Sequence, residues 1–226
     1  MNGETLDILA TWTPFLLQGF MWNIVIAICA VSLGTCIGAL LAWLRVAGSP
    51  KVSRGAARLS TFLGAVPTLA LIFYVVFVLP SDITIPLLDV TITIPQWLKA
   101  VIGLASAPLS YTTESLVVAH RNWSRGNIDA VMLFIPSWIN VFLISFGASS
   151  GASLVGVSEL VSRCNTVIAA TGTGMMVPVY LYCSLFFVLT SLLFTMLIRK
   201  FKHSQFMLRM HEKMTQAHAL SVRAAP

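Results

Sequence analysis

The side chains able to perform acid–base or nucleophilic chemistry are few and scattered along this chain. Glu159 stands near Ser153 and Ser158, but no histidine lies close to them in sequence, so a base-activated serine nucleophile is not indicated. The histidines do not cluster with carboxylates at the spacing of metal ligands. The sequence therefore predicts no catalytic constellation and no metal site, and we expect Glu159 to make polar contacts in a loop.

The densest group of polar side chains lies between two apolar segments, in the stretch Ser110–Pro136. Because this stretch is short and carries net positive charge, the positive-inside rule places it at the cytoplasmic face of a membrane. Two interpretations are open: a charged hairpin that only fixes the topology, or a docking surface for a cytoplasmic partner. Its charged and amide side chains include His120, Arg121, Asn122, Arg125, Asn127 and Asp129.

The composition is that of a polytopic membrane protein. Of the 226 residues, 57% are hydrophobic and only 10% are charged, and the mean hydropathy is +0.87. A soluble domain typically carries about 25% charged residues. The net charge of +6 gathers beside the apolar segments, as the positive-inside rule requires, and not on a face suited to nucleic acid. The expected surroundings are therefore lipid, with no nucleic-acid partner.

Five apolar segments approach or exceed the length needed to cross a ~30 Å hydrocarbon core. With the positive loops inside, the N-terminus lies outside and the C-terminus lies in the cytoplasm. We expect an external leader over 1–14, a transmembrane domain over 15–200 with a cytoplasmic loop near 119–129, and a basic cytoplasmic tail over 201–226. The five predicted spans cover residues 15–44, 59–79, 97–119, 130–146 and 175–198.

Several residues predict how these spans pack. Gly34 and Gly38 are spaced to let a second helix approach closely. Asn23 is polar at membrane depth and is expected to face protein, while Pro67 removes a backbone donor and predicts a kink. The four cysteines are interpreted as small apolar residues rather than a disulfide framework. The polar segment 159–174 is expected outside, with a short helix or a re-entrant turn.

Four segments carry motifs that occur together in one known family. Leu16–Arg45 has an opening glycine, internal glycines and a terminal Leu-Arg pair, and Gly64–Pro80 keeps the family's spacing between a proline and a Leu-Pro pair. Residues 153–160 read SLVGVSEL. In the central stretch the motif residues are Tyr111, Glu114, Gly126, Asn127 and the run Asp129-Ala130-Val131. In this order the four segments resemble the membrane permease subunit of bacterial ABC importers, in the polar amino-acid uptake group.

The resemblance implies a type I ABC importer-like, all-α fold of five transmembrane helices in the bacterial cytoplasmic (inner) membrane. It implies a second permease as partner, either another copy or a homologue. ABC ATPases would dock inside, and a periplasmic or lipid-anchored solute-binding protein would deliver substrate outside. Because the sequence lacks a Gly-Lys-Ser/Thr phosphate loop, ATP and Mg²⁺ would be bound by the ATPase, and this chain would need no cofactor. In such permeases the central loop transmits the ATPase movement, and here the coupling residues would be Arg121, Arg125, Gly126, Asn127, Asp129 and Ala130.

The sequence departs from that family at charged positions and in the central loop. The family's arginine before Pro67 and its charged pair at 147–150 are absent, and Asp129-Ala130-Val131 runs almost directly into Phe134-Ile135-Pro136 without a second helical arm. Because buried charges in spans are costly and usually functional, we expect that a charged amino acid is not bound by the usual residues. The polar residues expected along a substrate pathway are Thr68, Asn140, Ser145 and Ser149.

The sequence thus favours a non-catalytic permease subunit of an ATP-driven importer for amino acids or a related small polar solute. The alternative is a non-transporting membrane scaffold or regulatory subunit that retains the permease fold. A secondary transporter or channel is disfavoured because neither an internal repeat nor an intramembrane charge pair is recognised. A membrane enzyme is the weakest interpretation, since the chain has no catalytic constellation.

Overall fold

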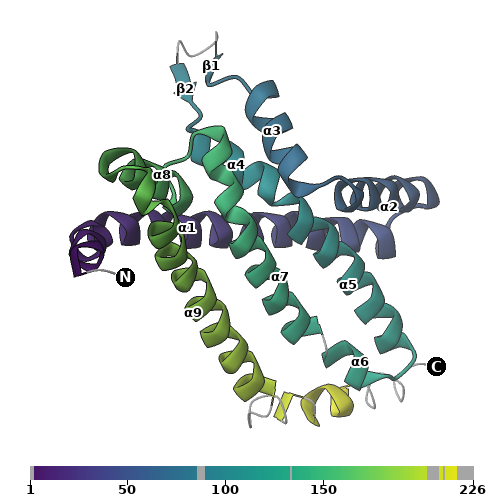
Figure 1. Ribbon diagram of the computed structural model, residues 1–226. Helices are drawn as coiled ribbons and strands as arrows, with labels where there is room; N and C mark the ends of the chain where they lie inside the picture. The colour runs from purple at the N-terminus through teal and green to yellow at the C-terminus, as the bar shows by residue number, and fades with distance from the viewer. Residues whose placement is uncertain (1–2, 86–89, 133, 203–208, 211, 218–226) are drawn as a thin grey trace, which may run out of the picture.

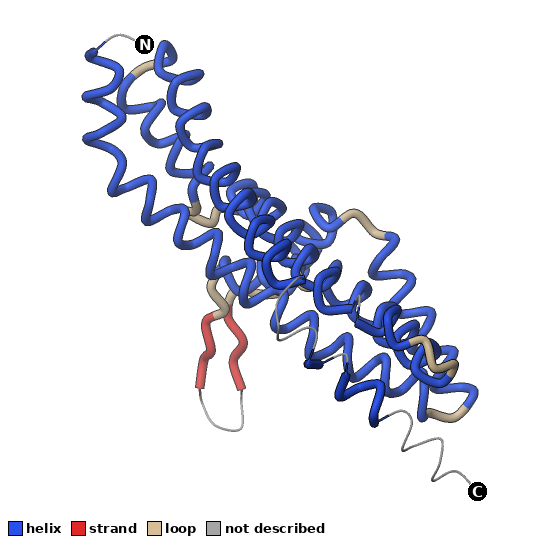
Figure 2. The backbone as a smooth tube through the Cα atoms, turned by 90° about the horizontal axis from the view of Figure 1, so that it is seen from below, coloured by secondary structure: helices blue, strands red, loops and turns tan. Residues whose placement is uncertain are grey.

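A computed structural model describes residues 3–85, 90–132, 134–202, 209–210 and 212–217. The described chain is almost entirely helical, with one pair of short strands (Figures 1 and 2). Its elements, in order, are α1 (Gly3–Ala47), α2 (Pro50–Ala65), α3 (Thr68–Val78), β1 (Asp82–Ile85), β2 (Val90–Thr93), α4 (Gln96–Leu104), α5 (Ser106–Ser124), α6 (Ile128–Met132), α7 (Phe134–Ala148), the 3₁₀ helix η1 (Ser149–Val155), α8 (Leu160–Thr171), the 3₁₀ turn η2 (Thr173–Met175) and α9 (Met176–Lys202).

Helix α1 is the element on which the others pack. It has 45 residues, which at about 1.5 Å per residue is roughly twice the length needed to cross a bilayer. It passes through Pro14 without a break and buries Leu9, so the described part of the predicted leader continues the first span. Residues of α1 belong to each of the three hydrophobic clusters, which join it to α8 and α9, to α3 and α4, and to α2 and α5.

The glycine pair of α1 is confirmed as a close helix contact. A Cβ atom on Gly34 would lie 2.6 Å from the carbonyl oxygen of Ala105, and one on Gly38 would lie 2.6 Å from that of Leu109. Real Cβ atoms essentially never approach backbone atoms so closely. The absence of side chains at these two positions is therefore what lets α1 lie directly on α5.

The predicted second span is not one straight helix. The chain bends by 103° between α2 and α3, and the break falls at Val66 and Pro67. A kink at Pro67 was expected, since proline lacks the N–H that would continue the helix, but the angle is far larger than a kink. The helix before the break also begins at Pro50, ahead of the predicted second span, which was expected to start at residue 59.

The predicted third span is likewise divided, into α4 and α5, with Ala105 between them. Pro108 lies in the first turn of α5, where a missing backbone N–H removes no intrahelical hydrogen bond. At its other end α5 continues to Ser124, so the helix includes Arg121 and extends into the predicted central loop.

The segment between α3 and α4 adds one short β-hairpin to an otherwise helical chain. Its alternating Thr and Ile residues form an antiparallel hairpin in which Asp82 pairs with Thr93 and Ile85 pairs with Val90. Lys99 holds the base of this hairpin. Its side chain is buried, and Nζ donates to the carbonyl oxygen of Leu79, at the end of α3, over 2.8 Å and to Ser81 Oγ over 3.2 Å. A lysine donor satisfies a helix-terminal carbonyl that would otherwise lack a partner.

The described residues contain three helices long and apolar enough to cross a membrane: residues 3–47, 128–155 and 173–200. The bent pair of α2 and α3 makes a fourth if it counts as one span. Large apolar side chains are exposed along α9, including Leu181, Leu185 and Leu189, which suits contact with lipid. The chain is therefore a helical multi-pass membrane protein.

Two smaller predictions are also resolved. The polar segment after residue 158 does contain a short helix, α8, which ends before the glycine at 172. The cysteines are free, and Cys164 and Cys183 lie within the hydrophobic core as small apolar side chains. Of the predicted tail, residues 203–208, 211 and 218–226 lie outside the described part of the chain.

Candidate functional site

The predicted coupling residues lie together at one end of the molecule, where α5 turns into α6 (Figure 1). Gly126 has a φ of 74°, a left-handed conformation that glycine adopts without steric cost. Asn127 then begins α6, because its Oδ1 accepts a hydrogen bond from the N–H of Ala130 over 3.2 Å. Arg121, Arg125 and Asp129 are exposed around this turn. The sequence thus builds a tight, basic tip with its side chains directed to solvent.

The predicted pathway residues are not brought together. Ser145 and Ser149 are buried inside the chain, and Thr68 is half-buried at the start of α3. Ser149 Oγ donates to the carbonyl oxygen of Phe146 over 2.6 Å and accepts from Asn23 over 3.0 Å. Of the four residues, Asn140 is exposed and lines a cavity.

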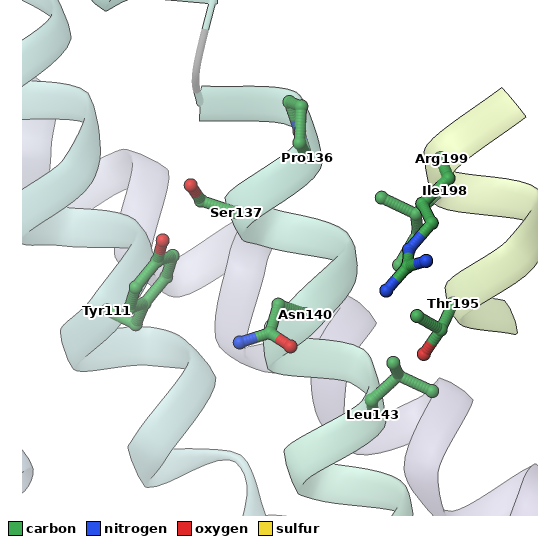
Figure 3. A pocket seen from close by; sticks show the side chains of 8 residues that line it. All are labelled: Tyr111, Pro136, Ser137, Asn140, Leu143, Thr195, Ile198 and Arg199. Carbon is green, nitrogen blue, oxygen red and sulfur yellow. The ribbon is translucent and has the colours of Figure 1, made fainter. Parts of the chain in front are cut away.

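That cavity lies between α5, α7 and α9 and has a volume of about 410 Å³. Figure 3 shows the carboxamide of Asn140 and the guanidinium of Arg199 directed into the same space. Tyr111 faces it from α5, and Ser137 and Thr195 add hydroxyl groups. Pro136, Leu143 and Ile198 complete the described lining. The cavity has the polar groups and the size needed to hold a small molecule.

A second polar cluster joins the middle of α1 to the start of α8. Asn23 is fully buried, as expected for a polar residue that faces protein. Its Nδ2 donates to Glu159 Oε2 over 2.8 Å, and its Oδ1 accepts from the N–H of Leu160 over 3.1 Å. Glu159 also caps α8 by accepting from the N–H groups of Val161 and Ser162. This geometry explains Glu159 as a structural residue.

The charge state of Glu159 reflects this buried position. The residue lies outside the candidate spans, between η1 and α8. Burial raises the pKa of its carboxyl group, and the hydrogen bonds from Val161, Asn23 and Ser162 oppose that shift. Beside it, Arg163 donates to the carbonyl oxygen of Phe15 and to Gln18 Oε1, which ties α8 to α1 a second time.

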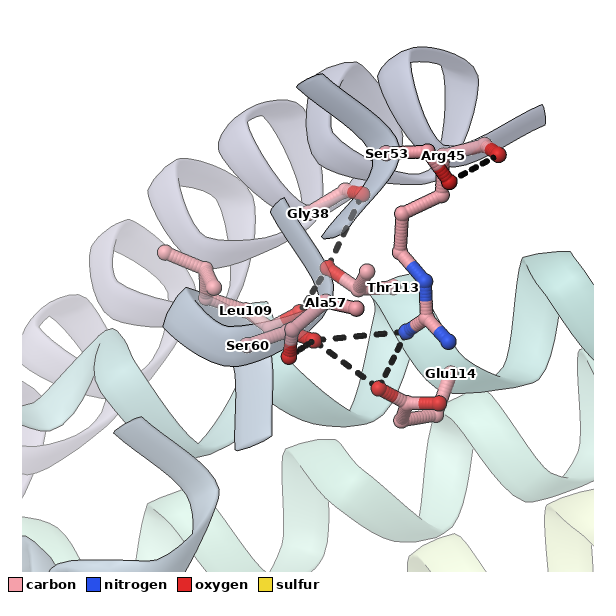
Figure 4. A network of polar contacts seen from close by, with 8 residues as sticks. All are labelled: Gly38, Arg45, Ser53, Ala57, Ser60, Leu109, Thr113 and Glu114. Carbon is pink, nitrogen blue, oxygen red and sulfur yellow. Dashed lines mark hydrogen bonds and ion pairs between the residues drawn. The ribbon is translucent and has the colours of Figure 1, made fainter. Parts of the chain in front are cut away.

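A third cluster fastens the ends of α1 and α2 to the middle of α5 (Figure 4). Arg45 Nη1 forms an ion pair with Glu114 Oε1. Ser60 Oγ donates to the same carboxylate oxygen over 2.9 Å and accepts from Arg45 over 3.3 Å. The partner of Glu114 therefore lies on the neighbouring helix α1. The cluster joins by polar contacts the same three helices that share a hydrophobic cluster.

Exchanging the charges of Arg45 and Glu114 tests this cluster. Arg45→Glu or Glu114→Arg alone should lower the free energy of unfolding by about 1–2 kcal/mol, because each leaves like charges facing one another and Glu114 is partly exposed. The double exchange should recover at least half of that loss. Unfolding midpoints in detergent measure the effect, with the exposed Arg58→Glu as control. Simple addition of the two single effects would contradict the pairing.

Sequence reasoning missed several of these residues. It found no charge pair among the spans, whereas Arg45 and Glu114 form one at the end of α1. It also assigned no role to Lys99 or Arg163, and it counted Arg199 only among the positive charges beside the last span. A cation placed inside an otherwise apolar segment was the available signal, since such residues are normally held by specific partners. Among the described residues, no three His, Cys, Asp or Glu side chains are placed to hold a metal ion.

No known protein-family profile matches the sequence, and no curated protein is similar enough in sequence to match. Among solved structures, the chain is similar to one described as the crystal structure of an amino acid ABC transporter with histidines. The TM-score is 0.74, and the match covers 90% of this chain and 99% of the other, at 16% sequence identity. At that identity the likeness establishes the fold alone, and the chain accordingly has an ABC permease-like fold.

Proposed function

We propose that this chain is the membrane-spanning permease subunit of an ATP-driven ABC importer for amino acids or a related small polar solute. The observation that carries the proposal is the fold, which matches a chain of an amino acid ABC transporter over nearly the full length of both. The permease itself performs no catalysis. A partner ATPase binds ATP and Mg²⁺, and a second permease completes the pathway.

The exposed turn between α5 and α6 suits the docking of the ATPase. Arg121 and Arg125 present guanidinium groups around a tip whose backbone is fixed by Gly126 and Asn127. Rigid helices lead away from this tip in both directions, α5 toward the Arg45–Glu114 cluster and α7 toward the cavity. A displacement of the turn is therefore passed to the bundle as a rigid-body movement.

The distribution of charge between the two ends of the molecule also supports docking of the ATPase at the α5–α6 turn. The β1–β2 hairpin and the α5–α6 turn lie at opposite ends of the molecule in Figure 1. Asp82 is on the hairpin, while Arg121 and Arg125 are at the turn, so the positive-inside rule places the turn in the cytoplasm. The proposal is for five spans, with the N-terminus outside and the chain in the bacterial inner membrane. A solute-binding protein then meets the hairpin end.

A non-transporting scaffold or regulatory subunit is the second candidate. It is favoured by the length of the connection: α5 ends at Ser124 and α6 begins at Ile128, so three residues, 125–127, join them. Such a short segment offers less surface to an ATPase than a loop with two helical arms. The family's charges before Pro67 and at 147–150 are also absent.

Purification of the complex from gently solubilised membranes distinguishes the two candidates. The wild-type chain should retain an ATPase that carries a phosphate loop, identified by mass spectrometry. The Arg121→Glu/Arg125→Glu variant should retain on the order of tenfold less, because reversing charges at a docking surface weakens association. Lys51→Glu/Arg58→Glu, which changes the net charge equally on exposed positions of α2, should retain the wild-type amount.

Two results would contradict these expectations. If no ATPase is retained, in a preparation from which a control importer keeps its own, the importer proposal is wrong and the scaffold is favoured. If both double variants lose the ATPase to the same extent, the turn is not the docking surface and only general electrostatics has been measured.

A further inference from the structure

The cavity between α5, α7 and α9 contains polar groups that the protein itself does not use. Within the described part of the chain, the side chains of Tyr111, Ser137, Asn140 and Arg199 form no hydrogen bond or ion pair. The hydroxyl of Thr195 donates to the carbonyl oxygen of Ser191. Four unpaired polar side chains around about 410 Å³ form a set of donors and acceptors available to a ligand.

The charge that the described residues bring to the cavity is positive only. Among the described residues that line the cavity, Arg199 is charged, and none is an aspartate or glutamate. No described carboxylate lies within 4.0 Å of its guanidinium, since the ion pair found in this part of the chain is that of Arg45 with Glu114. Arginine is always protonated, and its planar fork of N–H donors matches the geometry of carboxylate and phosphate oxygens.

We propose that this cavity binds a small carboxylate or phosphate anion that carries no ammonium group. Arg199 takes the carboxylate or phosphate oxygens through charge-assisted hydrogen bonds. Asn140 and Tyr111 hold neutral polar groups on the remainder of the ligand, and Leu143 and Ile198 contact its carbon atoms. The inference rests on the proposed function, whose substrate class it narrows from small polar solutes to anions.

The absence of a carboxylate among the described lining residues discriminates between anions and amino acids. A zwitterionic amino acid would place its ammonium group in a cavity where no described carboxylate is available to receive it. A cationic amino acid would in addition be repelled by Arg199. Arg199 attracts the anionic group of each solute, but an ammonium group meets no opposite charge among the described lining residues, so an anion without an amino group is preferred over both.

Ligand binding to the purified full chain in phosphatidylcholine nanodiscs tests the proposal. The probes are succinate, inorganic phosphate, glutamine and arginine at matched ionic strength, with binding measured by calorimetry and by the shift of the unfolding midpoint. Succinate or phosphate should bind and stabilise, while glutamine and arginine should bind at least tenfold more weakly. Arg199→Gln should weaken anion binding on the order of tenfold or more, and Arg199→Lys should recover part of it.

Lys200→Gln is the matched control, because it removes the adjacent cation of α9, which is exposed and absent from the cavity lining. It should bind the anion as the wild type does. The unfolding midpoint of each variant without ligand shows whether the variant is folded.

Several results would overturn the proposal: no anion binding, equal binding by Arg199→Gln, or a preference for glutamine or arginine. A further arm uses nanodiscs that contain phosphatidylglycerol. If Arg199 affects only the retention of that lipid, and neither succinate nor phosphate binds, the site is one for a lipid headgroup and the solute proposal fails.

The binding assay is separate from the test of the importer. Anion binding that depends on Arg199, in a chain that retains no ATPase, would support the cavity and contradict the importer. Retention of the ATPase without anion binding would support the importer and contradict the cavity.

Discussion

Gly34→Val should disrupt the contact between α1 and α5 and cost about 3 kcal/mol or more of unfolding free energy. The cost exceeds that of ordinary overpacking, which is about 1–3 kcal/mol, because the obstacles are backbone atoms. A Cβ on Gly34 would lie 2.6 Å from the carbonyl oxygen of Ala105 and 2.8 Å from the nitrogen of Leu109. Neither can turn aside as a flexible side chain can, so the two helices must separate.

Gly147→Val is the matched control for this experiment. Gly147 also lies in an apolar helix, α7, but nothing is within 4 Å of a Cβ built there. Both variants are compared by their yield of monodisperse protein after extraction and by their unfolding midpoints in denaturing detergent. Equal midpoints for the two variants would show that the close contact between α1 and α5 does not limit stability.

Asn23→Leu should lower the unfolding free energy by about 2–4 kcal/mol, the second large effect expected. The amide side chain makes three buried hydrogen bonds, to Ser149, to Glu159 and from the N–H of Leu160. Leucine has a similar volume but can make none of them, so the partner groups would remain buried without their bonds. One of those partners is a carboxylate, which makes the loss larger than for a neutral pair.

The control lies on the same helix. Ser32→Leu also replaces a polar residue of α1 by leucine, but Ser32 is exposed and has no hydrogen bond from its side chain within the described chain. Its unfolding midpoint should stay near that of the wild type. Thermal and detergent unfolding of the purified chain measure both variants. If Asn23→Leu is as stable as Ser32→Leu, the cluster at Asn23 contributes nothing to stability.

Local sequence signals determined much of this fold. Long apolar segments predicted the membrane helices, since lipid requires the backbone to satisfy its own hydrogen bonds. The spacing of Gly34 and Gly38 predicted a close helix contact, and Asn23 predicted a side chain that faces protein. Pro67 predicted the position of a kink, although the bend there, 103°, is far larger than a kink. Each of these features follows from the chemistry of one residue or one helix face, so the sequence alone is enough to predict it.

Only the tertiary structure decided which distant groups meet. The partner of Glu114 is Arg45, far away in sequence, and no periodic pattern encodes that pairing. Polarity alone gave Ser145 and Ser149 their predicted place on a pathway, and only the packing shows that both side chains are buried within this chain. Arg199 was expected to contribute only to the positive charge that fixes topology, but the packing of α9 against α7 directs it into a polar cavity that α5 also lines. These outcomes depend on how helices cross, a property of the whole set of contacts and not of any one segment.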